Sequence, residues 1–253
     1  MRKILCGFCV VAALAGCGGA SQHAARQQQA APREATAAKH CSAAARPLGS
    51  IATAYVAIVR HRTAAFRSPG GPVLARFGHM NRNGFPTVFS VVAVAKTGRC
   101  APAWYRVQLP MRPNGRTGWV RARAVQVQSV DTRILIHVRA RRLELLRAGR
   151  VVLRTAISTG EPATPTPIGR FYVKERLLPT DPNGPYGPAA LGTSAFSPVL
   201  KNWAQGGPVG IHGTDDPSAI GRPASHGCIR LPNAAMKRLF ALTPAGTPVI
   251  IRA

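Results

Sequence analysis

The chain of 253 residues has room for a short targeting segment and one or two compact domains. Its 34 Lys and Arg residues against 8 Asp and Glu residues give a formal net charge of +26, which suits anionic partners. The sequence has no run of basic residues interleaved with aromatic ones and no zinc-finger or helix-turn-helix pattern, so nucleic acid is not an expected partner. Anionic polymers or lipid head groups fit the charge better, unless the arginines serve solubility alone.

The N-terminus has the pattern of a secretory signal. Two basic residues, Arg2 and Lys3, precede an apolar run from Ile4 to Leu14 that is too short to span a membrane. The Leu-Ala-Gly-Cys sequence that ends at Cys17 resembles the lipobox of bacterial lipoproteins, which implies that Cys17 carries a lipid anchor. Residues 1–17 are therefore predicted to be a lipoprotein signal, with an ordinary signal peptide as the alternative.

The cysteines divide into a pair and a single thiol. With two cysteines inside the expected signal and Cys17 acylated, the mature protein keeps Cys41, Cys100 and Cys228. Spare thiols outside the cytoplasm tend to be oxidised to disulfides. We expect Cys41 to pair with Cys100 and Cys228 to stay free.

Residues 18–48 are predicted to be a flexible tether, because they contain hardly any large apolar side chain. Residues 49–128 are predicted to form a small all-β barrel, since β-rich runs alternate there with Gly, Pro and Asn. The runs are Tyr55 to Val59, Val73 to Phe77, Val88 to Val94, Trp104 to Leu109 and Trp119 to Val127. The second half of this segment resembles bacterial SH3-like domains, in which a hairpin ends in a Gly-Trp-Val strand. Trp104 and Trp119 are predicted to be core residues rather than binding aromatics.

Residues 129–253 change to the pattern of half-buried strands in hairpin order. The expected strands are Ile134 to Val138, Leu143 to Leu145, Val151 to Ile157, Phe171 to Val173 and Pro248 to Ile251. The stretch 178–207 is rich in Gly, Pro and Ser and is predicted to be a functional loop region.

One helix is expected near the C-terminus. Asn233 is predicted to cap it, and Met236, Leu239 and Phe240 form its apolar stripe. The Pro and Gly that follow at 244 and 246 are expected to stop it.

A thiol and two imidazoles lie in one short stretch of sequence. The run Gly-Ile-His-Gly-Thr contains His212, and Ser-His-Gly-Cys-Ile-Arg contains His226 and Cys228. A cysteine attacks as thiolate, and a free thiol pKa of about 8.5 leaves little thiolate at neutral pH, so an imidazole must take the proton. On chemistry alone either histidine is a candidate base. Zinc is not expected because no fourth ligand lies nearby, and a disulfide at Cys228 is a further alternative.

A His-Gly pair, a spacer and Ser-His-Gly-Cys followed by an apolar residue and Arg resembles the signature of the YkuD family of L,D-transpeptidases. The resemblance implies that Cys228 is the nucleophile, that His212 is its base and that the backbone carbonyl of Gly213 orients the His212 ring. Main-chain N–H groups at Gly227 and Cys228 are then candidates for an oxyanion hole. The other motif residues are expected to support the site: Ser225, His226 and Arg230.

A second motif upstream extends the resemblance. The Thr-Pro-Thr-Pro sequence from Thr164 resembles a loop that precedes a strand in the family, so the likeness spans about Arg133 to Ile251. Tyr186 and Gly187, in the predicted loop region, are candidates to line the substrate site, with plain turn chemistry as the alternative.

The resemblance implies a mostly β fold: an SH3-like small β-barrel followed by a YkuD-like β-sandwich catalytic domain with one short helix after the nucleophile. It implies a peptidoglycan L,D-transpeptidase that releases D-alanine from a tetrapeptide stem, holds the stem as a thioester on Cys228 and forms a 3→3 cross-link. Its partners would be peptidoglycan stem peptides, and no metal or organic cofactor is implied. Water as acceptor would make an L,D-carboxypeptidase instead, and a non-catalytic wall-binding lipoprotein is the alternative of a different class.

The expected location is the cell envelope, outside the cytoplasm, with the protein anchored to the membrane through Cys17. Anionic wall polymers are the further partners that its charge suits.

Overall fold

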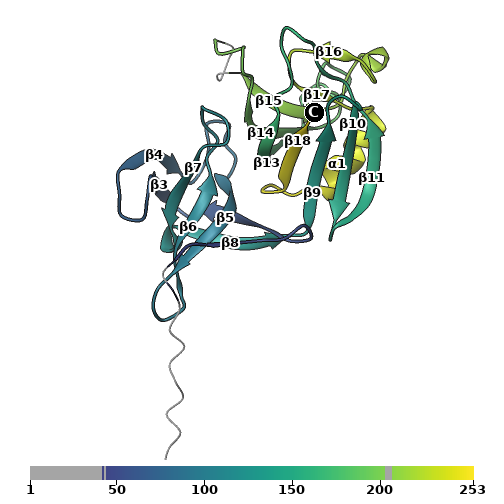
Figure 1. Ribbon diagram of the computed structural model, residues 1–253. Helices are drawn as coiled ribbons and strands as arrows, with labels where there is room; N and C mark the ends of the chain where they lie inside the picture. Colours follow the sequence, from purple (N-terminus) through teal and green to yellow (C-terminus); the bar gives the residue numbers. More distant parts are fainter. Residues whose placement is uncertain (1–41, 43, 203–206) are drawn as a thin grey trace, which may run out of the picture. The chain divides into compact units, whose positions relative to one another are not determined.

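The computed structural model describes residues 42, 44–202 and 207–253, drawn in colour in Figure 1. The expected signal, Cys17, Cys41 and most of the expected tether lie outside the described residues. In the part that is described, no helix is long and apolar enough to cross a membrane.

The first large sheet is built from residues 46–130. Its strands follow the order β4-β3-β7-β6-β5-β2-β8, and β1 pairs with β5 beside this path. The strands are β1 (Arg46–Pro47), β2 (Ala54–Val59), β3 (Arg62–Phe66), β4 (Val73–Gly78), β5 (Val88–Lys96), β6 (Pro102–Gln108), β7 (Thr117–Arg121) and β8 (Val125–Val130). The five β-rich runs all become strands, so the all-β prediction for this segment is confirmed, and we call residues 49–128 the N-terminal module.

Three details of this sheet differ from expectation. The predicted strand from Trp119 to Val127 is two strands, because the 3₁₀ turn η1 (Ala122–Ala124) breaks it. Strand β3 was not predicted, since its Arg-Thr-Ala-Ala-Phe sequence has little β-branched character. Strand β1 lies at the end of the expected tether and pairs with Val94 and Ala93 of β5.

The two tryptophans are not core residues, so that prediction was wrong. Side chains alternate across a strand, and the buried Val107 and Val120 place Trp104 and Trp119 on the opposite face. There the ring of Phe66 packs edge-on against Trp104 with centroids 5.4 Å apart. Both indoles are half-buried and lie on the outer side of the N-terminal module.

The second large sheet lies in the C-terminal half of the chain and contains His212 in strand β15. Its order is β11-β10-β9-β18-β13-β14-β15-β17, and a small parallel pair, β12 with β16, lies beside it. The strands are β9 (Thr132–His137), β10 (Arg142–Arg147), β11 (Arg150–Ala156), β12 (Thr159–Gly160), β13 (Gly169–Leu177), β14 (Ala190–Phe196), β15 (Pro208–His212), β16 (Pro223–Ser225), β17 (Ile229–Arg230) and β18 (Pro248–Arg252). The prediction of a mostly β fold is confirmed for the described residues. The C-terminal strand β18 lies between β9 and β13 (Figure 1).

The predicted loop region 178–207 contains strand β14, so part of that prediction was wrong. Leu191 and Ala195 of β14 are fully buried in the same apolar core as Ile134 and Val249. The Ala-Leu-Gly-Thr-Ser-Ala-Phe sequence lacks a strong β signal by itself. It forms a strand because its neighbours β13 and β15 satisfy its backbone on both sides.

The single helix of the described residues, α1 (Asn233–Leu242), covers this core. Met236 and Leu239 are fully buried in it and Phe240 packs against it, which confirms the predicted stripe. The helix ends before Pro244, as expected. Asn233 does not cap the helix: Pro232 holds the N-cap position and no side chain bonds the first turn.

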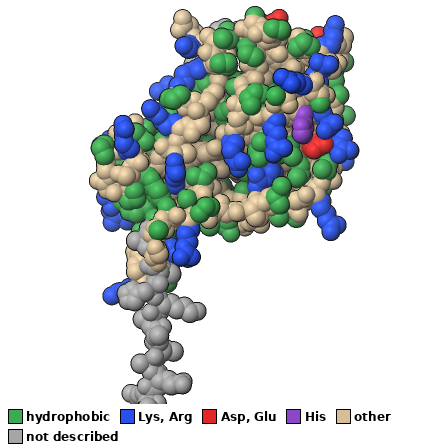
Figure 2. All heavy atoms as spheres, in the orientation of Figure 1, with side chains coloured by type: hydrophobic (Ala, Val, Ile, Leu, Met, Phe, Trp, Pro, Cys, Tyr) green, Lys and Arg blue, Asp and Glu red, His purple; other side chains and the backbone are tan. Residues whose placement is uncertain are grey.

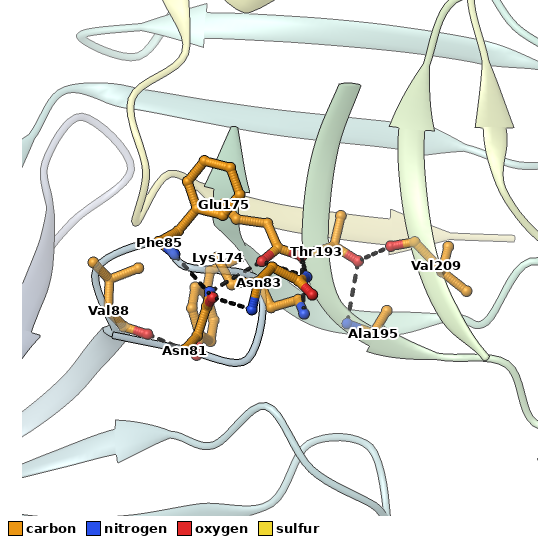
Figure 3. A network of polar contacts seen from close by, with 10 residues as sticks. Asn81, Asn83, Phe85, Val88, Lys174, Glu175, Thr193, Ala195 and Val209 are labelled. Carbon is orange, nitrogen blue, oxygen red and sulfur yellow. Dashed lines mark hydrogen bonds and ion pairs between the residues drawn. The ribbon is translucent and has the colours of Figure 1, made fainter. Parts of the chain in front are cut away.

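A buried carboxylate links strand β13 to the loop between β4 and β5. Glu175 is 5% exposed and accepts hydrogen bonds from the amides of Asn81 and Asn83, at 3.0 Å each, beside an ion pair with Lys174 (Figure 3). A buried charge is tolerated where such partners replace water. Because β13 pairs with β14 and β14 with β15, this network holds one side of the strand ladder that leads to His212.

We expect Asn83→Ala to lower the free energy of unfolding by about 1–3 kcal/mol, because it leaves Glu175 buried with fewer donors. Urea unfolding measures the change. In a Glu175→Gln background the same substitution should have a clearly smaller effect, since the charge that needs the amide is gone. An equal loss in both backgrounds would show that Asn83 acts through packing alone.

Candidate active site

Two parallel neighbouring strands place Cys228 beside the strand that carries His212. Strands β15 and β17 pair with Ile211 opposite Ile229 and His212 opposite Arg230. This register places Cys228, one residue before β17, beside Gly210. The N–H of Gly210 donates to Cys228 Sγ at 3.4 Å, so the nucleophile candidate is held at the edge of the strand that carries His212.

One ring nitrogen of His212 is hydrogen-bonded to the backbone, and the other can accept a proton. Its Nδ1 lies 2.7 Å from the carbonyl oxygen of Gly213, which can only accept a hydrogen bond. The proton is therefore on Nδ1, and Nε2 is an acceptor. The ring also approaches Gly210: a Cβ placed on Gly210 would lie 3.9 Å from His212 Cδ2. The thiol and the imidazole therefore both lie near Gly210, which has no side chain to come between them.

Burial favours the uncharged form of both His212 and Cys228. Desolvation lowers the pKa of His212 from 6.5 to about 4, against the opposing effect of the Gly213 carbonyl, and the charge of Arg230 lowers it further. Desolvation also raises the pKa of the Cys228 thiol, and the Gly210 N–H and Arg230 oppose that rise. At neutral pH the pair is a thiol beside a neutral imidazole, which is the protonation state that a general base requires.

The same shift makes the stability of the protein depend on pH. Unfolded His212 takes up a proton below pH 6.5, whereas folded His212 stays neutral down to about pH 4. The contribution of His212 to the free energy of unfolding should therefore be fully present above pH 6.5. It should fall by about 3 kcal/mol as the pH drops to about 4. Urea unfolding across this range should show a shallower fall for His212→Gln, and identical slopes for both proteins would contradict the shift.

The turn that carries Cys228 is fixed by hydroxyl groups. Ser225 Oγ donates to the Cys228 carbonyl at 2.6 Å and accepts from the Gly227 N–H at 3.2 Å. Thr166 Oγ1 donates to the Gly227 carbonyl at 3.0 Å and accepts from the N–H of Gly160. Gly227 has φ +111°, a conformation that favours glycine. These bonds place the Thr-Pro-Thr-Pro loop directly beside the nucleophile.

Two of the other predicted motif residues lie at the edge of this turn. Arg230 donates from Nη1 to the Ala224 carbonyl at 3.4 Å, and its charge acts on both Cys228 and His212. His226 is exposed, whereas His212 is 4% exposed. The burial of the His212 ring and its contact with Gly213 favour His212 over the exposed His226 as the candidate base.

Tyr186 and Gly187 lie on the other side of the imidazole. The ring of Tyr186 meets the His212 ring at 66° with centroids 5.0 Å apart, and Tyr186 is 58% exposed. Gly187 packs against Gly213: a Cβ there would lie 2.7 Å from Gly213 Cα. This close approach allows the segment of Tyr186 to cover the His212 ring on its solvent side.

Sequence reasoning missed the role of Asn233. Its Oδ1 accepts from the N–H of Thr214 at 2.8 Å, and it would clash with a side chain on either Gly187 or Gly213. Asn233 therefore holds the chain just after Gly213, whose carbonyl fixes the His212 tautomer. An Asn at a helix start looks like a cap in the sequence, so only its contacts could reveal this role.

The described cysteines agree with the expected division. Cys228 is a free thiol. Cys100 is disulfide-bonded, and Cys41, its expected partner, lies outside the described residues.

Comparisons with known proteins place the C-terminal half in one family. Residues 131–251 match the family model YkuD, the L,D-transpeptidase catalytic domain. YkuD of Bacillus licheniformis is 34% identical over 123 residues, which cover 49% of this chain and 67% of that protein. YkuD of Bacillus subtilis is 33% identical over the same length and coverage. A crystal structure of an Enterococcus faecium L,D-transpeptidase mutant is 32% identical over 48% of this chain and 49% of that one, about half its length, with a TM-score of 0.37. The chain belongs to the YkuD family of L,D-transpeptidase catalytic domains.

Proposed function

We propose that the protein is a peptidoglycan L,D-transpeptidase that acts through a thioester on Cys228. The observation that carries this proposal is that Gly210 donates its N–H to Cys228 Sγ and also lies near the buried His212 ring, whose Nδ1 is bonded to the Gly213 carbonyl. Nε2 is then the acceptor for the thiol proton. Membership of the YkuD family supports the same reaction class.

In the acylation half, Cys228 Sγ attacks the carbonyl of the third residue of a tetrapeptide stem while its proton passes to His212 Nε2. The C–S bond forms, the C–N bond to the terminal D-alanine breaks, and His212 returns the proton to the leaving amine. The N–H of Gly227 already donates to Ser225 Oγ, so we assign the oxyanion contact first to the N–H of Cys228 itself.

In the second half, the amine of a neighbouring stem attacks the thioester and passes its proton to His212. The C–S bond breaks, the new amide is the 3→3 cross-link, and Cys228 recovers its proton. Because the thioester retains the reactivity of the cleaved amide, no nucleotide is required. With water as the acceptor, the same steps release a tripeptide.

The test is a product analysis of residues 18–253 incubated with a disaccharide-tetrapeptide that contains diaminopimelate. Mass spectrometry should find a cross-linked dimer together with free D-alanine, and Cys228→Ala should yield neither. A tripeptide without dimer would assign a carboxypeptidase. If neither the parent nor Cys228→Ala converts the substrate, the transpeptidase proposal is replaced by the non-catalytic wall-binding function.

We further propose that the protein is an envelope lipoprotein anchored through Cys17 and that its N-terminal module is SH3-like and contacts the wall. The sequence of residues 1–17 supports the first proposal. The Gly-Trp-Val strand β7 and the half-buried aromatic pair of Phe66 and Trp104 support the second. Globomycin-sensitive processing and acyl labelling that are both lost in Cys17→Ala would test the anchor.

A further inference from the structure

The outer face of the second large sheet carries arginines around an apolar centre. Leu135 of β9, Ile250 of β18 and Arg170 of β13 lie side by side in register. Arg133 and Arg252 lie two residues from Leu135 and Ile250, so they share this face, while Ile134 and Ile251 point into the core. Figure 2 shows Lys and Arg side chains gathered over this part of the surface.

A cavity of about 450 Å³ lies over these residues. All five line it, together with Gln108 and parts of the segments 47–54 and 90–92. No Asp or Glu is among the lining residues. The volume falls within the range of small-molecule sites, which is about 300–1,000 Å³.

The arginines of the cavity are not neutralised within the described residues. Glu144, which lies opposite Leu135 on β10, is already paired with Arg142 at 3.3 Å and Arg154 at 3.0 Å. For the cavity arginines, no carboxylate of the described part lies within ion-pair distance. The site therefore holds positive charge that a structural ion-pair network would have cancelled.

The guanidinium group of Arg133 is held by the main chain of the segment before β2. It donates from Nη2 to the Ser50 carbonyl at 2.6 Å and from Nε to the Ile51 carbonyl at 3.3 Å. Burial lowers the pKa of Arg133, and the charge of Arg170 lowers it further, so the two cations lie close enough to repel each other. An anion between them would relieve that repulsion.

We propose that this cavity binds an organic phosphate whose anionic group contacts Arg133, Arg170 and Arg252 and whose short carbon portion lies on Leu135 and Ile250. Guanidinium groups match phosphate oxygens in pairs, and three uncompensated cations suit a dianion better than a single carboxylate. The apolar floor selects an ester over inorganic phosphate. Neither Cys228 nor His212 lines the cavity, so this site is separate from the thiol site.

The test measures binding of glycerol 3-phosphate to residues 18–253 by titration calorimetry, with glycerol as the uncharged reference. The variant Arg170→Gln/Arg252→Gln should weaken binding by about tenfold or more, because it removes charge-assisted hydrogen bonds to the phosphate, which are stronger than neutral ones. The matched control Arg150→Gln/Arg238→Gln removes the same charge at exposed positions outside the cavity and should bind as the parent does. Both variants should keep the thermal midpoint of the parent, since the Arg133 contacts to the main chain remain.

Equal loss in both variants would mean that net charge alone attracts the ligand and would overturn the proposal, as would absence of binding by the parent. Sedimentation with phosphatidylglycerol vesicles, in the presence and absence of glycerol 3-phosphate, separates the two sources of the group. If glycerol 3-phosphate displaces the protein from the vesicles, the ligand of the cavity is a lipid head group. If the protein binds the soluble ester but not the vesicles, the ligand is a soluble or polymer-borne phosphate. D-alanine release is measured for the same three proteins. Calorimetry then reports on the anion site, and D-alanine release reports separately on the proposed catalysis.

Discussion

Cys228→Ala should lower the release of D-alanine from a tetrapeptide stem by about 10⁴-fold or more, to the level of the uncatalysed reaction. The substitution removes the sulfur on which the proposed acyl-enzyme forms, and no other free thiol is present among the described residues to replace it. Intact-mass measurement with a carbapenem should show a covalent adduct on the parent and none on the variant.

The Cys228 variant must stay folded for this result to be informative. Because Sγ accepts one weak contact from the Gly210 N–H, its removal should change the thermal midpoint little. Unaltered D-alanine release by a folded Cys228→Ala protein would place the nucleophile elsewhere.

His212→Gln should reduce kcat/KM by about 10³-fold at neutral pH, because the thiol then ionises without a base. The matched control is His79→Gln, which removes a histidine of the N-terminal module that also contacts a backbone carbonyl, that of Val59 at 3.0 Å. It should retain the parent activity. A loss of similar size in both variants would indicate a general folding defect.

The pH profile distinguishes a base from a structural histidine. The parent should keep its activity toward acidic pH and lose it only as His212 becomes protonated, near its lowered pKa of about 4. The His212→Gln profile should instead rise with pH, because thiolate must form directly from a Cys228 thiol whose pKa is raised by burial. Profiles of the same shape would show that His212 does not accept the proton.

Much of the strand content could be predicted because it depends on local pattern. The runs that become β2, β4 and β5 are rich in β-branched and aromatic residues and are bounded by turn residues. Strands β3 and β14 have weaker patterns and form because neighbouring strands satisfy their backbones. Long-range pairing of this kind cannot be read from a short window of sequence.

The tryptophans and Asn233 show a second limit. Trp104 and Trp119 are large and apolar, which favours burial, but the register of β6 and β7 turns them to the outer face. Asn233 occupies a position typical of a helix cap, yet its amide reaches the N–H of Thr214, nineteen residues away in the chain. Residue type specifies what a side chain can bond, and the fold decides which partner it meets.

For the site itself, the sequence determined the candidate groups: one thiol, two histidines and the glycines beside them, in the spacing of the YkuD motif. Chemistry alone left His212 and His226 equivalent as bases. Only the tertiary structure favours one of them, because the parallel pairing of β15 with β17 brings Cys228 to Gly210, two residues from a buried His212 whose Nδ1 is bonded to Gly213, while His226 is exposed. The arginine cavity likewise exists only in three dimensions, since Arg133, Arg170 and Arg252 are far apart in sequence and meet because β18 inserts between β9 and β13.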